Sequence, residues 1–356
     1  MYNINMKEDI EKIIKAGTMA PSGDNVQPWR FEVRGNTIKL FNIPNADNSL
    51  YNINQNASFI AHGAVIENII LKAQSLGYKL DISFFPEGEK SNLVAIISIE
   101  KGVIEENLSS YIEKRATNRK PYKNITLTHE QKNNILSCGD AYKEAKVLLA
   151  EDSEKVTELA NALSLNEQIV LENKQMHDFL FSHIVWSEEE EKEKRSGLYI
   201  KTLELKKPQE KMFNLVKNFT ILKILNKLVG ISKKVSRENA KVYAQSSAFI
   251  AISSEGDTAE SYIMAGQLMQ RVWLTITKEG LSAGPLMGVL LLAHRIRAGN
   301  TNGLSKKHTN LIKCASVEIK SIFAIKDDTI KVILRVGDGG EPSAYSSRRN
   351  PDIVFE

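Results

Sequence analysis

Two long stretches of the chain are apolar on nearly every face that a helix would present. The first covers residues 57–76 and stops at Gly77, and the second covers residues 259–279 and stops at Gly280. Glycine after the last apolar turn is a common helix terminator. Because a helix that is apolar all round is normally buried, we predict that both helices lie at the centre of the fold.

The two helices also share their glycines and their flanking strands. Gly63 and Gly77 of the first line up with Gly266 and Gly280 of the second at one common offset. A strand pattern precedes and follows each helix, near Ile38 and at 94–99 for the first, and at 248–252 and 331–336 for the second. This self-similarity indicates a diverged internal duplication of an α+β unit. Matching helices pack together across two-fold dimers, so we expect the two copies to do the same.

Residues 180–245 have no counterpart in the first half of the chain. They contain a charged run at 187–194 and then apolar residues at helical spacing from Met212 to Val229, with lysines among them. A basic amphipathic helix can lie on a membrane surface, or it can pack its apolar side on its own protein. Since no lipid-anchor motif accompanies the helix, we expect it to pack.

Composition narrows the classes of protein to consider. At 356 residues the chain has room for two domains, and its 42% hydrophobic and 25% charged content is ordinary for a globular protein. The net charge of +4 is spread along the chain as lysine alternating with glutamate, which does not favour a nucleic-acid partner. The six histidines show no ligand spacing with cysteines or carboxylates, so we expect no metal site.

Three further features bear on location. Cys138 and Cys314 stand in no metal or redox spacing, which points to a reducing compartment without structural disulfides. Charged residues at 7–9 precede any apolar run, so we expect no signal peptide. The purest apolar run, residues 289–293, is too short to span a bilayer. We therefore expect a cytoplasmic protein with no membrane partner.

The most unusual stretch of the chain is Ala-Pro-Ser-Gly-Asp-Asn-Val-Gln-Pro-Trp at residues 20–29. Its two prolines fix φ and remove two backbone donors, and Gly23 permits a φ closed to other residues. The loop also carries short side chains that donate and accept hydrogen bonds, on Ser22, Asn25 and Gln27. A stiff loop of this kind suits the edge of a flat heterocycle such as a flavin, although the same residues also make an ordinary turn.

Three other segments carry candidate chemistry. Arg115 and Arg119, with Thr117 between them, have the residue types that converge on a phosphate, and they also fit a surface arginine pair. Residues 284–288, Gly-Pro-Leu-Met-Gly, follow the second apolar helix as a tight connection. Arg348 and Arg349 form a basic pair near the end of the chain, where arginines are usually solvated.

These segments together resemble the nitroreductase-like FMN oxidoreductases. Residues 20–29 resemble the Pro-Ser-x-x-Asn-x-Gln-Pro-Trp signature, which in that family crosses from one subunit to cover the flavin held mainly by the other. Residues 114–122 resemble its Arg-x-Ser-x-Lys/Arg phosphate segment, with Thr117 in place of serine. Residues 285–288 resemble its Pro-hydrophobic-x-Gly segment, whose backbone faces flavin N5 and O4. Arg348 and Arg349 resemble the C-terminal pair that completes the phosphate site.

The resemblance implies a set of cofactor-binding residues, with Asn239 added because the family often has an asparagine reaching the flavin at that place. The set is Pro21, Ser22, Gly23, Asn25, Gln27, Arg115, Thr117, Arg119, Asn239, Pro285, Leu286, Met287, Gly288, Arg348 and Arg349. No catalytic side chain is implied, because hydride enters and leaves at N5 of FMN itself.

The resemblance looks closest to the two-domain, Acg-type FMN-binding proteins, in which one chain imitates a dimer. It implies an α+β, nitroreductase-like fold with two related halves. Residues 1–104 would supply the covering loop, and residues 105–356 would supply the phosphate site. A helical insertion at about 180–245 would form a lid. Since the start of the first half, residues 1–7, has no such arginine pair, we expect one site per chain and a monomeric pseudo-dimer.

The implied activity is reduction of FMN by NAD(P)H and then of a nitro compound, quinone or similar small electrophile, by ping-pong hydride transfer. A flavin-binding or flavin-sequestering protein with a lid-closed site and little turnover is the alternative. A third possibility is a membrane-surface protein that uses the basic helix. The sequence names neither the physiological acceptor nor the preferred nicotinamide.

Overall fold

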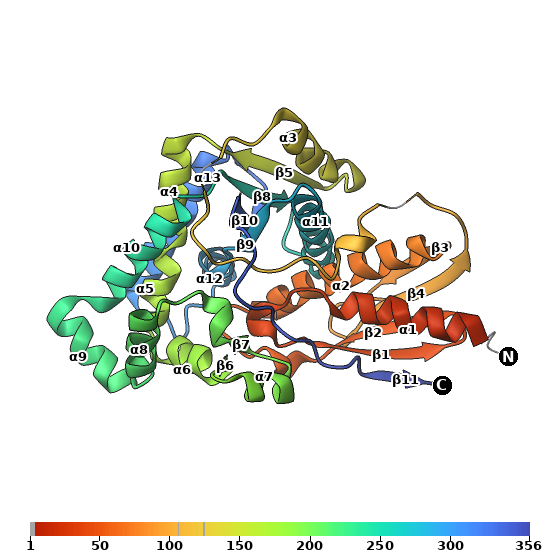
Figure 1. Ribbon diagram of the computed structural model, residues 1–356, viewed down its shortest axis with the longest axis horizontal. Coiled ribbons are helices and arrows are strands. Elements are labelled where there is room, and N and C mark those ends of the chain that lie inside the picture. The colour runs from red at the N-terminus through yellow and green to blue at the C-terminus, as the bar shows by residue number, and fades with distance from the viewer. Residues whose placement is uncertain (1–3, 106, 124) are drawn as a thin grey trace.

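The computed structural model describes residues 4–105, 107–123 and 125–356, which form two larger β-sheets flanked by helices (Figure 1). The strands of the first sheet have the order β11-β1-β2-β4-β3. Their bounds are Trp29–Arg34 for β1, Thr37–Asn42 for β2, Tyr78–Phe84 for β3, Leu93–Lys101 for β4 and Ile353–Phe355 for β11. The second sheet has the order β5-β8-β10-β9. Its bounds are Ala145–Ala150 for β5, Ala248–Ser254 for β8, Ser282–Pro285 for β9 and Thr329–Gly337 for β10.

The two sheets repeat one topology. In each, the first two strands in chain order are antiparallel neighbours, the fourth strand lies beside the second, and the third lies at the outer edge. The first sheet has one additional strand, β11, which pairs with β1 in parallel so that Phe31 lies opposite Ile353. A segment from the end of the chain therefore completes the sheet made at its beginning.

The two predicted apolar helices are present at the centre of the molecule (Figure 1). They are α2, Asn56–Ser75, and α11, Ala259–Lys278, and side chains of both belong to one core with residues of both sheets. The helices cross at Gly63 and Gly266. A Cβ atom at Gly63 would lie 2.0 Å from the carbonyl oxygen of Ile263, and one at Gly266 would lie 2.0 Å from that of Ile60. Only glycine allows so close an approach.

The contacts at this crossing are reciprocal. Gly63 and Gly266 are 203 positions apart, and the same offset relates Ile60 to Ile263. Beyond the crossing, the same offset relates Glu67 to Gln270 and Asn68 to Arg271, so that it converts one polar pair into another. Gln270 Nε2 donates to Asn68 Oδ1 at 2.8 Å, and Arg271 pairs with the buried Glu67 at 2.7 Å. Such exchange is the signature of contacts across a two-fold axis.

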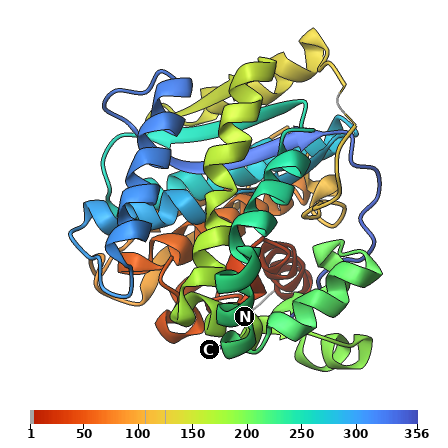
Figure 2. The same cartoon turned by 90° about the vertical axis from the view of Figure 1, so that its left-hand side faces the viewer.

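Helices fill the interval between β5 and β8. They are α4 Ser153–Leu163, α5 Leu165–Glu172, α6 Lys174–His183, α7 Glu188–Lys194, α8 Lys207–Val216, α9 Phe219–Val229 and α10 Ile231–Tyr243. This helical interval therefore begins before residue 180, where we expected the insertion to start. The remaining helices are α1 Ile4–Thr18, α3 His129–Leu136, α12 Gly288–Arg297 and α13 Lys306–Ile322. Figure 2 shows α13, α4 and α10 side by side as an outer layer over the second sheet.

The basic amphipathic stretch differs from its prediction. It forms two helices, because the Asn218 side chain accepts hydrogen bonds from the amides of Thr220 and Ile221 and starts a new helix, α9. Val216 and Leu222 are buried in a cluster with α6 and β7, Leu198–Tyr199. Five other apolar side chains stay exposed, namely Met212, Leu215, Ile224, Leu228 and Val229. The expectation that the whole stripe packs was therefore wrong. Within the described residues, no helix combines the length and apolarity needed to cross a bilayer.

Candidate functional site

The loop at residues 20–28 has an unusual backbone. Asp24, Asn25 and Gln27 have φ values of 42°, 55° and 51°, a region that costs non-glycine residues energy. Ser22 holds the loop closed, because its Oγ accepts from the amide of Gln27 at 3.0 Å and its carbonyl accepts from the amide of Asn25 at 3.1 Å. At the start of the loop, Pro21 is half-buried and Gly23 is exposed. Strain of this kind persists where the surroundings fix the conformation.

Two arginines from distant segments meet at the start of this loop. Arg115 donates from a terminal nitrogen to the carbonyl of Met19 at 3.0 Å, and Arg348 Nε donates to the carbonyl of the next residue, Ala20, at 3.2 Å. Arg115 is buried and lies over the ring of Trp273 on α11, 4.6 Å from its centroid. Arg115 and Arg348 thus lie at neighbouring backbone carbonyls, and their shared role in one cofactor site stays a prediction.

Among the described residues, neither Arg115 nor Arg348 forms an ion pair within 4.0 Å, and Glu191 is the acidic residue whose charge acts on Arg348. Burial lowers the pKa of Arg115 to about 9, with a further contribution from the charge of Arg348. Burial also lowers the pKa of Arg348 to about 10, opposed by the charge of Glu191. The buried Nε of Arg115 has no hydrogen-bond partner in the described part of the chain. Desolvated like charges of this kind favour a bound anion.

Arg349 and Gln27 join the loop to the end of the chain. A terminal nitrogen of Arg349 donates to the carbonyls of Val26 and Gln27 at 2.6 and 2.7 Å, and the amide of Arg349 donates to Gln27 Oε1 at 2.9 Å. Asn25 Nδ2 donates to the carbonyl of Ser347 at 3.1 Å. The Oδ1 atom of Asn25 is buried without a partner in the described part of the chain, so one acceptor in the loop is left for a donor from outside.

Arg119 lies apart from Arg115. The segment between them is extended, with Thr117 bridged to Ala283 of β9, so residues four apart are separated by roughly 13 Å rather than by one helical turn. Arg119 donates to the carbonyl of Thr202 at 3.1 Å. It also faces Asp24, whose pKa burial raises to about 6, against the opposing charges of His183 and Arg119. Arg115 and Arg119 therefore donate to different carbonyls, those of Met19 and Thr202, and their convergence on one phosphate stays a prediction.

The segment at 285–288 adjoins the arginine segment. Asn118 donates its amide to the carbonyl of Ala283 at 3.0 Å, and β9 then ends at Pro285. Leu286 donates its amide to the carbonyl of Ile333, and α12 begins directly after Met287, at Gly288. Residues 285–288 are half-buried. Residues 115–119 therefore contact β9 at Ala283, directly before the segment at 285–288, and the segments at 115–119 and 348–349 both contact the start of the loop.

Asn166 and Tyr51 cover the start of α12, and no sequence pattern pointed to either residue. A Cβ atom at Gly288 would lie 2.0 Å from Asn166 Oδ1, so the side chain rests directly on the glycine. Tyr51 donates its hydroxyl to the same oxygen at 2.7 Å. Only a contact between residues far apart in sequence reveals this arrangement.

Glu167, the next residue on α5, is a buried carboxyl in the same region. The residue as a whole is half-buried, but its Oε2 is covered and has no partner among the described residues. Its Oε1 accepts from the hydroxyl of Tyr243 on α10 at 2.9 Å. Burial raises the pKa of Glu167 to about 7. Asn239 lies one turn before Tyr243 on the same side of α10, half-buried.

We expect Glu167→Gln to stabilise the protein at pH 8 and to have little effect at pH 4. Between the ordinary pKa of 4.5 and the folded value of about 7, the folded state keeps a proton that the unfolded state has released. Stability therefore falls as pH rises through this window, by of order 2–3 kcal/mol, and glutamine removes that loss. Urea unfolding of both proteins across this range measures the effect. A difference in stability that does not change with pH would contradict the assignment.

A segment of the helical interval crosses the loop. Gln27 Nε2 donates to the carbonyl of Arg195 at 2.8 Å, the amide of Ser347 donates to Glu191 Oε1 at 2.6 Å, and Arg119 reaches Thr202. The covering segment is therefore residues 191–202, together with Asn166. Within the described residues, no hydrogen bond joins α8 or α9 to the predicted site residues.

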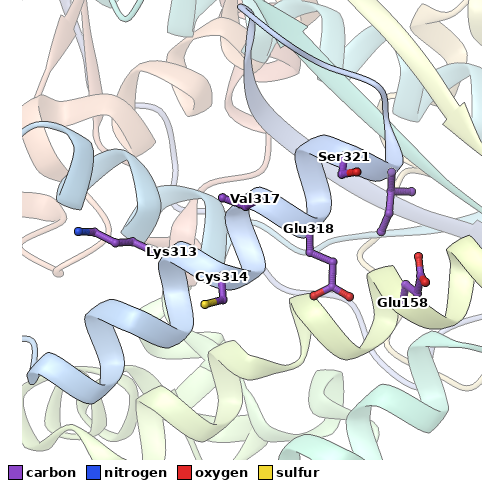
Figure 3. A pocket seen from close by; sticks show the side chains of 7 residues that line it. Glu158, Lys313, Cys314, Val317, Glu318 and Ser321 are labelled. Atoms are coloured by element: carbon purple, nitrogen blue, oxygen red, sulfur yellow. The ribbon is translucent and has the colours of Figure 1, made fainter.

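The open surface depressions lie elsewhere. One is a groove between α4 and α13, where Glu158, Cys314 and Glu318 project (Figure 3). Another is lined by Cys138, Arg271 and their neighbours. Neither contains a predicted site residue. In the described part of the chain, no group of three or more His, Cys, Asp or Glu side chains could hold a metal ion.

The chain has distant relatives among known proteins. No family model matches it. An uncharacterized protein of Mycobacterium tuberculosis is 22% identical over 285 residues, which are 80% of this chain and 39% of the relative. Another protein of M. tuberculosis, named "Putative NAD(P)H nitroreductase", is 24% identical over 118 residues, 32% of this chain and 34% of that protein. The chain thus matches only about two fifths or less of the length of these relatives.

Solved structures give similarities at low scores. A nitroreductase with bound FMN from Bacteroides fragilis is 9% identical, and the match covers 69% of this chain and 95% of that chain with a TM-score of 0.36. An FMN-dependent nitroreductase from Mycobacterium smegmatis in complex with NADPH is 11% identical, and the match covers 68% of this chain and 91% of that chain with a TM-score of 0.36.

Proposed function

We propose that this chain binds FMN and uses NAD(P)H to reduce small electrophiles such as nitro compounds or quinones. The observation that carries the proposal is the meeting of Arg115 and Arg348 at the start of the loop of residues 20–28, without an ion pair within 4.0 Å among the described residues. Three segments distant in sequence meet there, and the family resemblance implies a role in cofactor binding for each. The name of one curated relative, an NAD(P)H nitroreductase designation qualified as putative, agrees with this activity.

The residues present fit FMN. Arg115 and Arg348 would hold the phosphate, because the pair is desolvated and a buried Nε donor lacks a partner. Asn25 Oδ1 would accept from the flavin ring, since it is a buried acceptor without a partner. Bound FMN would supply the centre that accepts and donates hydride. The protein's part is to orient the cofactor and to exclude water, and residues 191–202 and Asn166 serve the second purpose.

We further propose that the chain is a fused pseudo-dimer, with halves at 1–104 and 105–356, and that only one of two related sites survives. The counterpart of the loop between α1 and β1 is the connection between α3 and β5. There, Tyr142 donates its hydroxyl to Glu67 at 2.5 Å, and Glu67 pairs with Arg271. Arg271 therefore has a carboxylate partner at the place where a second cofactor would require a cation without one, although its buried Nε has no hydrogen-bond partner among the described residues. We therefore expect one FMN in a monomeric chain.

A flavin-sequestering protein is the second candidate, because the contacts of Gln27 with Arg195 and of Asn166 with Gly288 cover the site. Such a cover would slow the exchange of nicotinamide and acceptor. Flavin binding is common to both candidates, so the rate of flavin reduction separates them.

We expect the purified protein, reconstituted with FMN, to hold one FMN per chain and to lose its yellow colour when NAD(P)H is added without oxygen. Flavin extraction with quantitation gives the stoichiometry, and stopped-flow absorbance gives the reduction rate. Bound flavin that NADH and NADPH both leave oxidised favours the sequestering protein. Two FMN per chain contradicts the single surviving site, and no FMN at all contradicts the proposal.

A further inference from the structure

Lysine and glutamate do not alternate evenly along the whole chain as described above, because positive charge is concentrated in one segment. Residues 206–234, which we call the basic arm, contain eight lysines and one glutamate, a net charge of +7. The whole chain has a net charge of +4, so the rest of it is net negative at −3. The basic arm consists of α8, α9 and the start of α10. A local excess of this size marks a surface that attracts anions.

The lysines of the basic arm are not neutralised by the protein. Within the described residues, none of the eight forms an ion pair within 4.0 Å, although other lysines of the same helical interval do. Lys217 lies over the ring of Trp186, 5.4 Å from its centroid, and that contact leaves its charge in place. The positive charge therefore faces solvent.

The basic arm also exposes large apolar side chains. Leu215 on α8 is 46% exposed, and Ile224 and Leu228 on α9 are 54% and 72% exposed. Met212 and Val229 are exposed as well. Single exposed apolar residues are ordinary, but a group on two adjacent short helices marks an interaction surface.

The apolar and basic side chains share one face of α9. Leu222 on the inner side is fully buried, whereas Ile224 and Leu228, one turn apart, point outward. Lys223 and Lys227 are also one turn apart and exposed, directly beside them in the helix. Apolar side chains flanked by lysines on one face are the arrangement of helices that lie in a membrane interface.

The shape of the surface of the basic arm favours a bilayer over a protein partner. A partner helix docks in an apolar groove, and neither of the surface depressions described above contains a residue of the basic arm. In Figure 1, α9 lies at the left edge of the molecule, at the end of an extension from the body. We propose that the basic arm docks the protein on anionic lipid bilayers, with Leu215, Ile224 and Leu228 entering the headgroup region and the lysines contacting lipid phosphates. This inference does not depend on the proposed flavin chemistry.

We expect the full chain to cosediment with vesicles of equal parts phosphatidylglycerol and phosphatidylcholine, and not with phosphatidylcholine alone. Lys223→Gln with Lys227→Gln should weaken partitioning by about fivefold for each lysine, and added salt should weaken it further. Ile224→Gln with Leu228→Gln should weaken it by at least about tenfold. All four side chains are exposed, so both variants should keep the wild-type unfolding temperature.

A matched control comes from α13, where Lys313 and Val317 are also exposed and one turn apart (Figure 3). Lys313→Gln with Val317→Gln should leave vesicle binding unchanged. Absence of vesicle binding, or binding that neither variant of the basic arm reduces, overturns the proposal. Self-association of the wild type that Ile224→Gln with Leu228→Gln abolishes, without vesicle binding, would overturn it in favour of a protein contact.

Discussion

The Gly63→Ala protein is expected to lose at least about 3 kcal/mol of folding free energy. A Cβ atom at residue 63 would lie 2.0 Å from the carbonyl oxygen of Ile263 and 2.8 Å from the Cα of Gly266. These are backbone atoms, which cannot turn aside as a flexible side chain can. The two central helices would have to separate, and the core shared by both sheets would open. Thermal unfolding should show a midpoint roughly 5–10 °C below that of the wild type.

Gly139→Ala provides the control for this prediction. The nearest atom to a Cβ there is a side-chain carbon of Val147 at 3.5 Å, an ordinary contact, so the midpoint should move by no more than about a degree. Gly266→Ala should cost as much as Gly63→Ala because the contacts are reciprocal. Equal midpoints for the Gly63 and Gly139 variants would mean that the helices do not cross this closely in solution.

Arg115→Ala and Arg348→Ala should each weaken FMN binding by roughly tenfold to a hundredfold and leave riboflavin binding nearly unchanged. Riboflavin is FMN without the phosphate, and the proposed role of both arginines is to contact that phosphate. A hydrogen bond to a charged group is worth about 1.5–3 kcal/mol. Fluorescence titration of both ligands measures the two affinities. Arg115→Lys should retain part of the affinity, since the charge stays but the second donor is lost.

Arg119→Ala is the contrasting variant. The resemblance places Arg119 in the same phosphate clamp, but the extended segment directs it to Thr202 and Asp24. We expect its loss to affect FMN and riboflavin alike, through the cover at residues 191–202. If Arg119→Ala weakens the binding of FMN but not of riboflavin, Arg119 contacts the phosphate after all. Equal losses of FMN and riboflavin for Arg115→Ala would refute the phosphate role of Arg115.

Patterns of local spacing predicted the parts of the fold that depend on one element at a time. The all-round apolar character of α2 and α11 and the common offset of their glycines predicted that the two helices pack together at the centre, whereas their crossing at Gly63 and Gly266 came from the structure. The break between α8 and α9 was missed, although Asn218 is a strong helix-capping residue. Its local hydrogen bonds outweighed the continuity of the apolar stripe, and the turn then left part of that stripe exposed.

The candidate site shows the same division. The family resemblance predicts that Arg115, Arg348 and the loop of residues 20–28 belong to one cofactor site. Asn166 and Glu167 belong to the same region, but they sit in a helix whose sequence gives no sign of its neighbours. Their roles come from tertiary contacts with Gly288 and Tyr243. The convergence of Arg115 and Arg119 on one phosphate stays a prediction, since the two side chains donate to different carbonyls, those of Met19 and Thr202.

The pairing of β1 with β11 bears on how the nascent chain matures. The side-chain oxygen of Gln27 accepts a hydrogen bond from the amide of Arg349, 322 positions later. Phe31 of β1 likewise has its strand partner, Ile353, near the other end of the chain. A ribosome adds roughly 5–20 residues per second, so the free edge of β1 persists for about 15–60 s. An unpaired edge is a template for pairing with other chains, which makes this interval the one most exposed to aggregation.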